Sequence, residues 1–500
     1  MNRSVGSAAA LLAAAACAAP FASAAQDTAS PTLAIPAAHA RLGFERVRFP
    51  GDGPRVGLVG ASYLVDVAGL PGVSIGPAVY GAVSGNHGGF FTLGGEVAWR
   101  QRLVGPVGIE LGLYAGGGGG GGAPAGGGLM LRPHADVVWD LGPVAVGVSL
   151  SHVNLSAGRV SSTQLGLVLN ANSDFRFVPA ERLGQPALGR GRGGLGFDRI
   201  QLVGGVYRTP AGRALLDGRP LPRTISTIGI RAEQSALGGS GFWGIEAQRA
   251  GRGGVGGYAE VLGTVGLEKE LLRDRFTVGA RIAAGMAGGG GVSTGGGLLV
   301  KAAAYGIARI NDDLGVSIEL GAARAPNGNF RAIEGSAALV WALDGPGSGG
   351  AAARPARTDF SAGAERYDAP RGGGGAQPLT AVRLKLDRYL SANAYVTGQA
   401  LSAAGGQASG YSGALVGAGW RQPFGPRWFA GAELLAGAAG GGGVDGHGVL
   451  VEPRVFAGVQ LTPSLGLRAG VGRVKAIGGR LDSTVFDAGL VVTYGVSTGR

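Results

Sequence analysis

The chain of 500 residues has little cysteine, little histidine and few charged side chains. Its single cysteine, Cys17, excludes a disulfide framework. The five histidines are scattered, so no cluster has the spacing of a zinc site. Charged residues make up 15% of the chain, against about 25% in average soluble proteins. We therefore expect no metal site, no cofactor and no thiol chemistry.

Long hydrophobic runs are also missing, since no stretch after residue 24 reaches about 18 apolar residues without Gly, Pro or charge. This excludes a helical membrane anchor. The amino terminus has Arg3, a small apolar run over 8–19, and Ala22-Ser23-Ala24. That pattern is typical of a secretory signal peptide, here 1–24, followed by an N-terminal segment, 25–40. A lipoprotein acylated at Cys17 is the alternative, although no branched aliphatic residue stands three positions earlier.

Glycine, by contrast, is abundant, with 102 residues, about one position in five. An ordinary packed core has about 7% glycine. The hydrophobic fraction of 45% argues against disorder, and no Gly-X-Y period suggests collagen. The net charge of +12 would suit a nucleic-acid partner, but export and an aromatic content of 7% speak against one.

Sequence repetition divides the chain into three units. Trp99-Arg100-Gln101 recurs as Trp420-Arg421-Gln422, and the glycine run 119–122 recurs at 288–291 and 440–443. Repeats of this kind indicate repeated structural units. The predicted units are 41–178, 197–344 and 357–500, separated by linkers 179–196 and 345–356.

Inside the units the apolar residues alternate with period two, which predicts β-strands. Val144, Val146 and Val148 alternate with small residues, for example. Each unit has about eight such segments and no sustained helical period. In the third unit the predicted strands are 358–367, 379–390, 392–403, 410–422, 427–438, 448–460, 465–474 and 482–494. The alternation slips near Thr264 to Glu268, where we expect a β-bulge.

The aliphatic faces must be buried, and the opposite faces carry mostly Gly, Ser and Ala. We expect the aliphatic faces to contact lipid and the small faces to line a lumen, as in an all-β, antiparallel transmembrane barrel. Glycine and serine would leave voids inside a narrow ring. This favours one barrel of about 24 strands built from three eight-strand repeats; three tandem eight-stranded barrels are the alternative.

Large aromatic residues fall at the ends of even-numbered strands, which the topology places at one interface. We predict an aromatic girdle there. Its members are Trp99, Trp139, Trp341, Trp420 and Tyr494. The alternative is a general preference of aromatic residues for strand ends.

The last strand, from Asp487 through Gly489 and Val492 to Tyr494, resembles the closing strand of Gram-negative outer-membrane β-barrel (porin-like) proteins. No narrower family is indicated. The resemblance implies insertion by the barrel-assembly machinery. Together with the signal peptide it indicates Sec-type export to the outer membrane, where lipid and lipopolysaccharide are the expected contacts. It implies an assembly signal at these four residues, although six residues follow Tyr494 where many members end. The oligomeric state stays open.

Two groups of charged residues are candidate functional sites. Arg100, Lys269 and Arg421 are expected to face the lumen and bias a pore toward anions, or else to be solvated strand ends. A second group is expected near lipopolysaccharide phosphates, or else serves solubility at the membrane edge. Its members are His152, Arg324, Arg473, Arg159, Arg331 and Arg480.

Catalytic chemistry is not expected. His152 with Asn154 and Ser156 suggests a membrane hydrolase, but arginine stands at the matching position of the other units. The glycine runs lack the helix and the Lys-Ser/Thr of a nucleotide loop. The sequence therefore favours an outer-membrane channel for passive passage of hydrophilic solutes, with anions as the narrower expectation, or of a secreted polymer. The alternative is a non-conducting outer-membrane scaffold, or a surface-attachment or secretion accessory component.

Overall fold

The computed structural model describes residues 34–51, 53–156, 158–184, 194–272, 275–343, 355–372, 374–446 and 448–496. The predicted signal peptide, Cys17, most of the N-terminal segment and parts of both predicted linkers lie outside the described residues.

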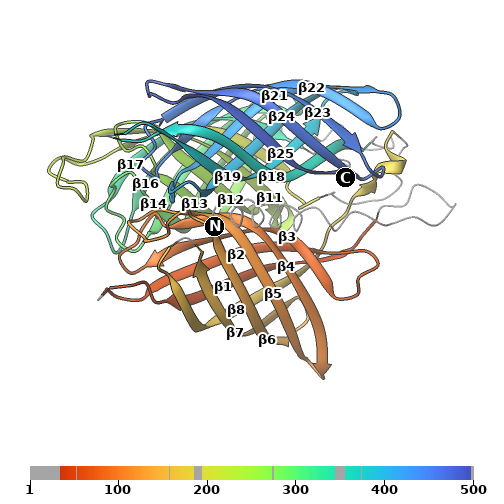
Figure 1. Cartoon of the computed structure of the whole chain (residues 1–500), viewed down its shortest axis with the longest axis horizontal. Helices are drawn as coiled ribbons and strands as arrows, with labels where there is room; N and C mark the ends of the chain where they lie inside the picture. Colours follow the sequence, from red (N-terminus) through yellow and green to blue (C-terminus); the bar gives the residue numbers. More distant parts are fainter. Residues whose placement is uncertain are drawn as a thin grey trace.

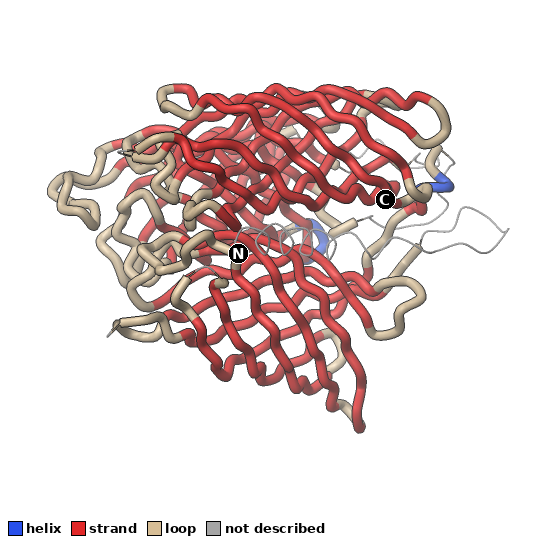
Figure 2. The backbone as a smooth tube through the Cα atoms, viewed as in Figure 1, coloured by secondary structure: helices blue, strands red, loops and turns tan. Residues whose placement is uncertain are grey.

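Most described residues belong to antiparallel strands, which follow one another around three closed sheets (Figures 1 and 2). We name these sheets ring 1, ring 2 and ring 3. Ring 1 consists of β1 (Ala37–Val47), β2 (Val56–Asp66), β3 (Val73–Ser84), β4 (Phe91–Val104), β5 (Val107–Gly119), β6 (Met130–Asp140), β7 (Val144–Leu155) and β8 (Ser161–Asp174).

Ring 2 consists of β10 (Arg199–Arg208), β11 (Thr224–Ala236), β12 (Gly241–Arg252), β13 (Ala259–Leu271), β14 (Phe276–Gly288), β15 (Leu298–Arg309), β16 (Leu314–Arg324) and β17 (Arg331–Ala342). Ring 3 consists of β18 (Ala356–Pro370), β19 (Ala376–Tyr389), β20 (Ala394–Gly405), β21 (Ser412–Phe424), β22 (Trp428–Gly440), β23 (Gly448–Gln460), β24 (Leu465–Ile477) and β25 (Asp482–Val496). The 3-10 turns η2 (Ala180–Arg182) and η3 (Leu237–Gly239) and the short β9 (Val178–Pro179), which pairs with β25, complete the described elements.

The first and last strands of each ring pair with each other, so each sheet closes on itself. β1 pairs with β8, β10 with β17, and β18 with β25. The described strands therefore do not join into the single ring of about 24 strands that we favoured. That expectation counted glycine and serine as the lumen lining and overlooked the large charged and aromatic side chains that fill the narrow interiors.

Period-two alternation correctly located the strands. In the third unit, the predicted strand ends differ from the observed ends by at most three residues. The aliphatic faces point outward as expected, because Val148 and Leu150 are 53% and 51% exposed while Ser149 and Ser151 are buried. Side chains of alternate residues lie on opposite faces of a strand, so one face of each ring is apolar.

Each ring has a β-bulge near the end of its third strand. The pairing skips Val83 in β3, Gly251 in β12 and Ala404 in β20. The bulge expected near Thr264 to Glu268 is wrong, because β13 pairs with β14 in unbroken register from Ala259 to Leu271. The small residues that interrupt the apolar pattern there lie in a regular strand.

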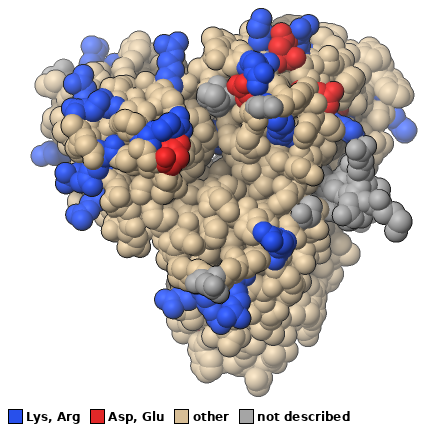
Figure 3. Space-filling view, turned by 60° about the vertical axis from the view of Figure 1, so that its left-hand side comes forward, with Lys and Arg blue, Asp and Glu red and all other residues tan. Residues whose placement is uncertain are grey.

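The three rings contact one another in a cycle. The third strand of each ring packs on the fifth strand of the next, β3 on β14, β12 on β22, and β20 on β5. A head-to-tail contact that repeats in this way closes a ring of three members. Figure 3 shows the result as three lobes around a common centre.

Glycine-rich turns form the contacts between the rings. The Gly88 amide donates to the Gly295 carbonyl at 3.0 Å, and the Gly410 amide donates to the Gly118 carbonyl at 3.1 Å. At Gly89 the φ angle is +89°, and an added Cβ would lie 2.2 Å from the backbone nitrogen of Gly289. Only glycine allows both that φ angle and that approach. Part of the high glycine content thus serves the packing of ring on ring.

Candidate functional site

Each ring has two opposite ends, the glycine end and the tryptophan end. The glycine end carries the turns that follow the first, third, fifth and seventh strands of each ring, including the glycine runs 119–122, 288–291 and 440–443. The tryptophan end is the opposite one, where the strands carrying Trp99 and Trp139 finish.

The interior of ring 1 holds a network of buried ion pairs. Arg41 on β1 donates to Asp136 on β6 at 2.7 and 2.9 Å, and Arg132 donates to Glu45 at 2.8 and 3.1 Å. His134 lies between Asp136 and Glu96, 3.1 Å from each. These side chains are at most 6% exposed. Such charges are stable in an interior only when they are paired and hydrogen-bonded.

Rings 2 and 3 are filled in a similar way. In ring 2, Lys301 contacts Glu246 at 2.6 Å, Glu334 at 2.8 Å and Glu260 at 3.0 Å. In ring 3, Glu433 accepts from Arg468 at 2.6 Å and contacts Lys385 at 3.0 Å. All three interiors are therefore occupied by the chain's own side chains, as eight-stranded barrels require.

One position distinguishes ring 1 from the other two. Between the fifth and sixth strands, Glu110 stands in register with Asp136 in ring 1. The corresponding pairs are Gly279 with Tyr305 in ring 2 and Gly431 with Phe456 in ring 3. A Cβ at Gly279 or Gly431 would lie 2.5 or 2.4 Å from the facing aromatic ring. Two rings thus pack an aromatic side chain over a glycine, where ring 1 has two carboxylates.

Among the described residues, these two carboxylates and one histidine form a cluster of side chains that could hold a metal ion. Ligand atoms of Glu110, His134 and Asp136 all lie within 4.8 Å of one another. His39 is fully buried next to them, with Nε2 3.3 Å from Glu110 Oε2. The histidines are scattered in the sequence, and this pattern did not predict the cluster. His39 on β1 and His134 on β6 come together only in the folded ring.

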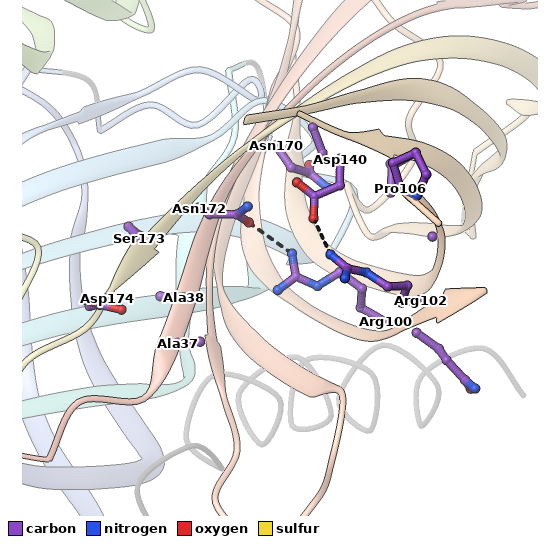
Figure 4. A pocket seen from close by; sticks show the side chains of 14 residues that line it. Ala37, Ala38, Arg100, Arg102, Pro106, Asp140, Asn170, Asn172, Ser173 and Asp174 are labelled. Carbon is purple, nitrogen blue, oxygen red and sulfur yellow. Dashed lines mark hydrogen bonds and ion pairs between the residues drawn. The ribbon is translucent and has the colours of Figure 1, made fainter. Parts of the chain in front are cut away.

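A cavity of about 550 Å³ opens at the tryptophan end of ring 1 (Figure 4). Arg100 donates to Asn172 at 3.3 Å and Arg102 donates to Asp140 at 2.9 Å across its mouth. Gly108, Val138 and Asn170 also line the cavity. The pocket found at the same end of ring 2 has only about 40 Å³. Ring 1 is thus more open than ring 2 at this end.

The three predicted lumen cations lie in different surroundings. Arg100 is half-buried at the cavity of ring 1. Arg421 is buried in ring 3, with its guanidinium carbon 3.9 Å from the ring centre of Phe429. Lys269 is exposed, on the same side of β13 as the exposed Leu267. Its expected lumen position is therefore wrong, because the uninterrupted register keeps it on the outward side.

All six tryptophans of the chain lie toward the tryptophan end. Trp99, Trp139 and Trp420 are exposed, and Trp341 is half-buried. Trp243 and Trp428 are exposed too, near the starts of β12 and β22. We missed these two by considering only strands that finish at this end.

Tyr494 differs from the other predicted girdle members, because it is 7% exposed. Phe175 and Phe177 cover it, with ring centres 5.8 and 6.2 Å away. These two residues follow the last strand of ring 1 and pack against the last strand of ring 3. The expected surface position of Tyr494 is therefore wrong, since a contact between rings buries it.

Basic side chains dominate the exposed surface at the glycine end (Figure 3). The exposed ones are Arg46, Arg48, Arg55, Arg159, Arg208, Arg219, Arg223, Arg252, Arg324, Arg331, Arg366, Arg473, Lys475 and Arg480. This set contains the five predicted arginines. We call these fourteen residues the basic rim.

Several acids near the basic rim are already paired. Arg473 contacts Asp482 at 2.6 Å, and Arg480 contacts Asp445. A hydrogen bond from Arg219 lowers the pKa of the Asp217 carboxyl in the turn before β11. The pairs leave most of the basic rim without a described carboxylate partner.

His152 also lies at the glycine end, where its nitrogens contact Thr163 Oγ1 at 2.7 Å and Ser161 Oγ at 3.3 Å. No described carboxylate orients the imidazole. A hydrolytic His-Ser pair needs such an orienting group.

The closing strand β25 contributes to both faces of ring 3. Asp487 points inward and contacts Arg383 at 3.0 Å and Arg454 at 3.2 Å. Gly489 pairs with Gly363 of β18. Val492 is fully buried with Tyr494 in the contact with ring 1.

The fold defines a class, the closed antiparallel β-barrel proteins. Among the described residues, no helix has both the length and the apolar character to cross a bilayer. No protein-family model and no curated protein sequence matches this chain.

Solved structures similar to this chain are Gram-negative outer-membrane β-barrel proteins. The copper transporter OprC is 10% identical, with 94% of this chain and 81% of that one covered and a TM-score of 0.30. The siderophore receptor PiuA from Acinetobacter baumannii is 8% identical, with 92% and 82% covered and a TM-score of 0.27. OprB from Pseudomonas putida is 9% identical, with 93% and 94% covered and a TM-score of 0.24. At these values nothing that those proteins bind or transport is carried over to this chain.

Proposed function

We propose that this chain is an outer-membrane protein whose three rings cross the bilayer side by side. The support is the outward face, where large aliphatic side chains such as Leu165 and Ile318 are 73% and 70% exposed. The ring strands have 10 to 15 residues, enough for the roughly 9–11 that a tilted strand needs to span a bilayer. Closed rings also satisfy the backbone hydrogen bonds without water.

The two ends then face different sides of the membrane. The tryptophan end lies at the periplasmic interface, where indole side chains are favoured. The basic rim lies outside, where arginines contact the phosphates of lipopolysaccharide. Export by a signal peptide over 1–24 and insertion through the closing strand by the barrel-assembly machinery belong to this proposal.

Within the membrane the protein acts as a surface-attachment component that neither conducts solutes nor catalyses a reaction. Its basic rim makes the contacts at the cell surface. The observation that supports this is the occupation of all three interiors by buried ion pairs. The Lys301 cluster of ring 2 and the Glu433 cluster of ring 3 block the path that a hydrated solute would take. A passive pore requires a continuous water-filled lumen.

Planar-bilayer recording of the purified full chain tests this proposal. We expect no stable conductance steps after insertion. Insertion is checked independently by quenching of tryptophan fluorescence with brominated lipids, since all six tryptophans lie toward one end. Large stable conductance would disprove the closed interior, and absence of quenching would disprove the membrane location.

A passive path for anions through ring 1 is the second candidate function. It is favoured by the cavity, where Arg100 and Arg102 surround the mouth. If conductance is seen, Arg100→Glu should shift its selectivity toward cations, whereas Arg421→Glu in the filled ring 3 should not.

A further inference from the structure

Three buried polar side chains in ring 1 have acceptor atoms with no hydrogen-bond partner among the described residues. Neither ring nitrogen of His39 is bonded, nor are Glu110 Oε1 and Asn170 Oδ1. All three residues are fully buried. They lie close together, because Glu110 Oε2 is 3.3 Å from His39 Nε2 and 3.5 Å from Asn170 Nδ2. Unsatisfied buried acceptors that converge in this way indicate an absent donor or cation.

The charges of the ring 1 interior point to a cation. Two buried arginines, Arg41 and Arg132, are present. They face four buried carboxylates, those of Glu45, Glu96, Glu110 and Asp136. His134 contacts Asp136 with one ring nitrogen and Glu96 with the other, so both nitrogens donate and the side chain offsets one of these charges. One more negative than positive charge then remains. Uncompensated buried charge is costly, and a cation bound at Glu110 would offset this excess.

The donor set has the chemistry of a metal site. An imidazole nitrogen, carboxylate oxygens and an amide oxygen are the ligands that divalent transition metals accept in proteins. Asp136 and His134 offer further ligand atoms within 4.8 Å of Glu110. The nearby Arg41 is held by Asp136, with Nη2 at 2.7 Å, and its Nε is 3.5 Å from Glu110 Oε1. His39 on β1 and Asn170 on β8, which both carry unpartnered atoms, contact Glu110 from other strands.

The cavity at the tryptophan end gives access to this cluster. Asn170 lines the cavity and contacts Glu110 behind it. Gly108 and Val138, which also line the cavity, stand two residues from Glu110 and Asp136 on the same faces of β5 and β6. One step of two residues along a strand is about 7 Å, so the cluster lies one layer below the lining.

We propose that the interior of ring 1 binds one divalent transition-metal cation through His39, Glu110 and Asn170, with Asp136 beside them. Rings 2 and 3 lack this site, since Gly279 and Gly431 replace the glutamate. The site stands on the contacts inside ring 1 and does not depend on the membrane location.

Zinc binding by the purified full chain in detergent tests the proposal. The protein is stripped with EDTA and dialysed against Zn²⁺, and bound metal is measured by mass spectrometry. We expect about one Zn²⁺ per chain for a single site. Loss of a ligand in Glu110→Gln or His39→Gln should weaken binding at least about tenfold.

The matched control is His152→Gln, which removes an imidazole at the glycine end and should leave binding unchanged. Asn170→Asp adds a charged ligand and should tighten binding, a result that misfolding cannot mimic. Folding of each variant is checked by circular dichroism and by the mobility of unheated samples in gels. The proposal is overturned if the wild-type chain binds no Zn²⁺, or if Glu110→Gln binds as well as wild type. It is also overturned if binding is lost in His152→Gln, or if Asn170→Asp binds no better than wild type.

Discussion

Between the fifth and sixth strands, ring 1 places two carboxylates opposite each other, whereas rings 2 and 3 place an aromatic ring over a glycine. The aromatic side chains occupy space near the tryptophan end. Phe456 packs near Phe429, and Tyr305 packs near Phe242. Ring 1 instead retains a cavity of about 550 Å³ at that end. Rings of one topology are thus filled by different chemistry, and ring 1 keeps at this end a cavity lined by Asn170, which contacts the buried Glu110.

Removing a buried glutamate should affect the two kinds of ring very differently, and this is the largest effect we expect. Glu433→Gln in ring 3 removes a carboxylate that Lys385 and Arg468 share, and leaves Asp387 as the acid that contacts both. Breaking buried ion pairs in this way costs about 3–5 kcal/mol. Glu110→Gln in metal-free ring 1 removes excess negative charge and should change the free energy of unfolding by less than about 1 kcal/mol.

Urea unfolding of both variants in lipid vesicles measures this difference. Equal losses of stability would contradict the contrast between the rings. A large loss for Glu110→Gln alone would show that Glu110 is a well-paired structural residue.

The contacts between rings, unlike their interiors, are alike, and substitutions there should have similar and intermediate effects. An added Cβ would lie 2.2 Å from Gly289 N at Gly89, 3.0 Å from Gly441 Cα at Gly257, and 2.7 Å from Gly120 Cα at Gly410. Each glycine→Ala change should cost about 1–3 kcal/mol through overpacking, in addition to the strain of a positive φ angle.

The control for that strain is Gly69→Ala, with a φ angle of +81° and no atom within 4 Å of the added Cβ. Thermal unfolding of the four variants is the measurement. If Gly69→Ala is as destabilising as the others, the close approach between rings contributes nothing.

The smallest effect concerns alanine at inward-facing glycines of β5 and β14. Gly279→Ala should cost about 1–2 kcal/mol, because the added methyl group meets Tyr305 and the Leu267 carbonyl. Gly108→Ala lies at the cavity of ring 1, where the first contact is at 3.3 Å, and should cost less than about 1 kcal/mol. Chemical denaturation of the two single variants compares them; a larger cost at Gly108 would show that the cavity is closed in solution.

Local pattern was sufficient to predict the strands and their outward faces. The alternation of Val144, Val146 and Val148 depends only on neighbours in the chain, and so does the placement of Trp99 near a strand end. Ring closure was not predictable in this way, since pairing of β1 with β8 joins residues more than a hundred positions apart.

The candidate metal cluster escaped the sequence for the same reason. His39, Glu110 and Asn170 lie on three strands, and no spacing rule connects them. A usable signal existed in the glycines, because Glu110 interrupts a position where the other two units have Gly279 and Gly431. The burial of Tyr494 depends on contact with Phe175 and Phe177 of another ring, which no local pattern contains.

The head-to-tail cycle of rings lies within a single polypeptide, and this has a consequence for assembly. Three separate subunits would fall apart on dilution, but members joined by linkers keep a high effective concentration for each other. The stoichiometry of the three members is fixed by synthesis. One member is therefore free to acquire new residues by mutation without the change appearing in all three, as it would in a homotrimer.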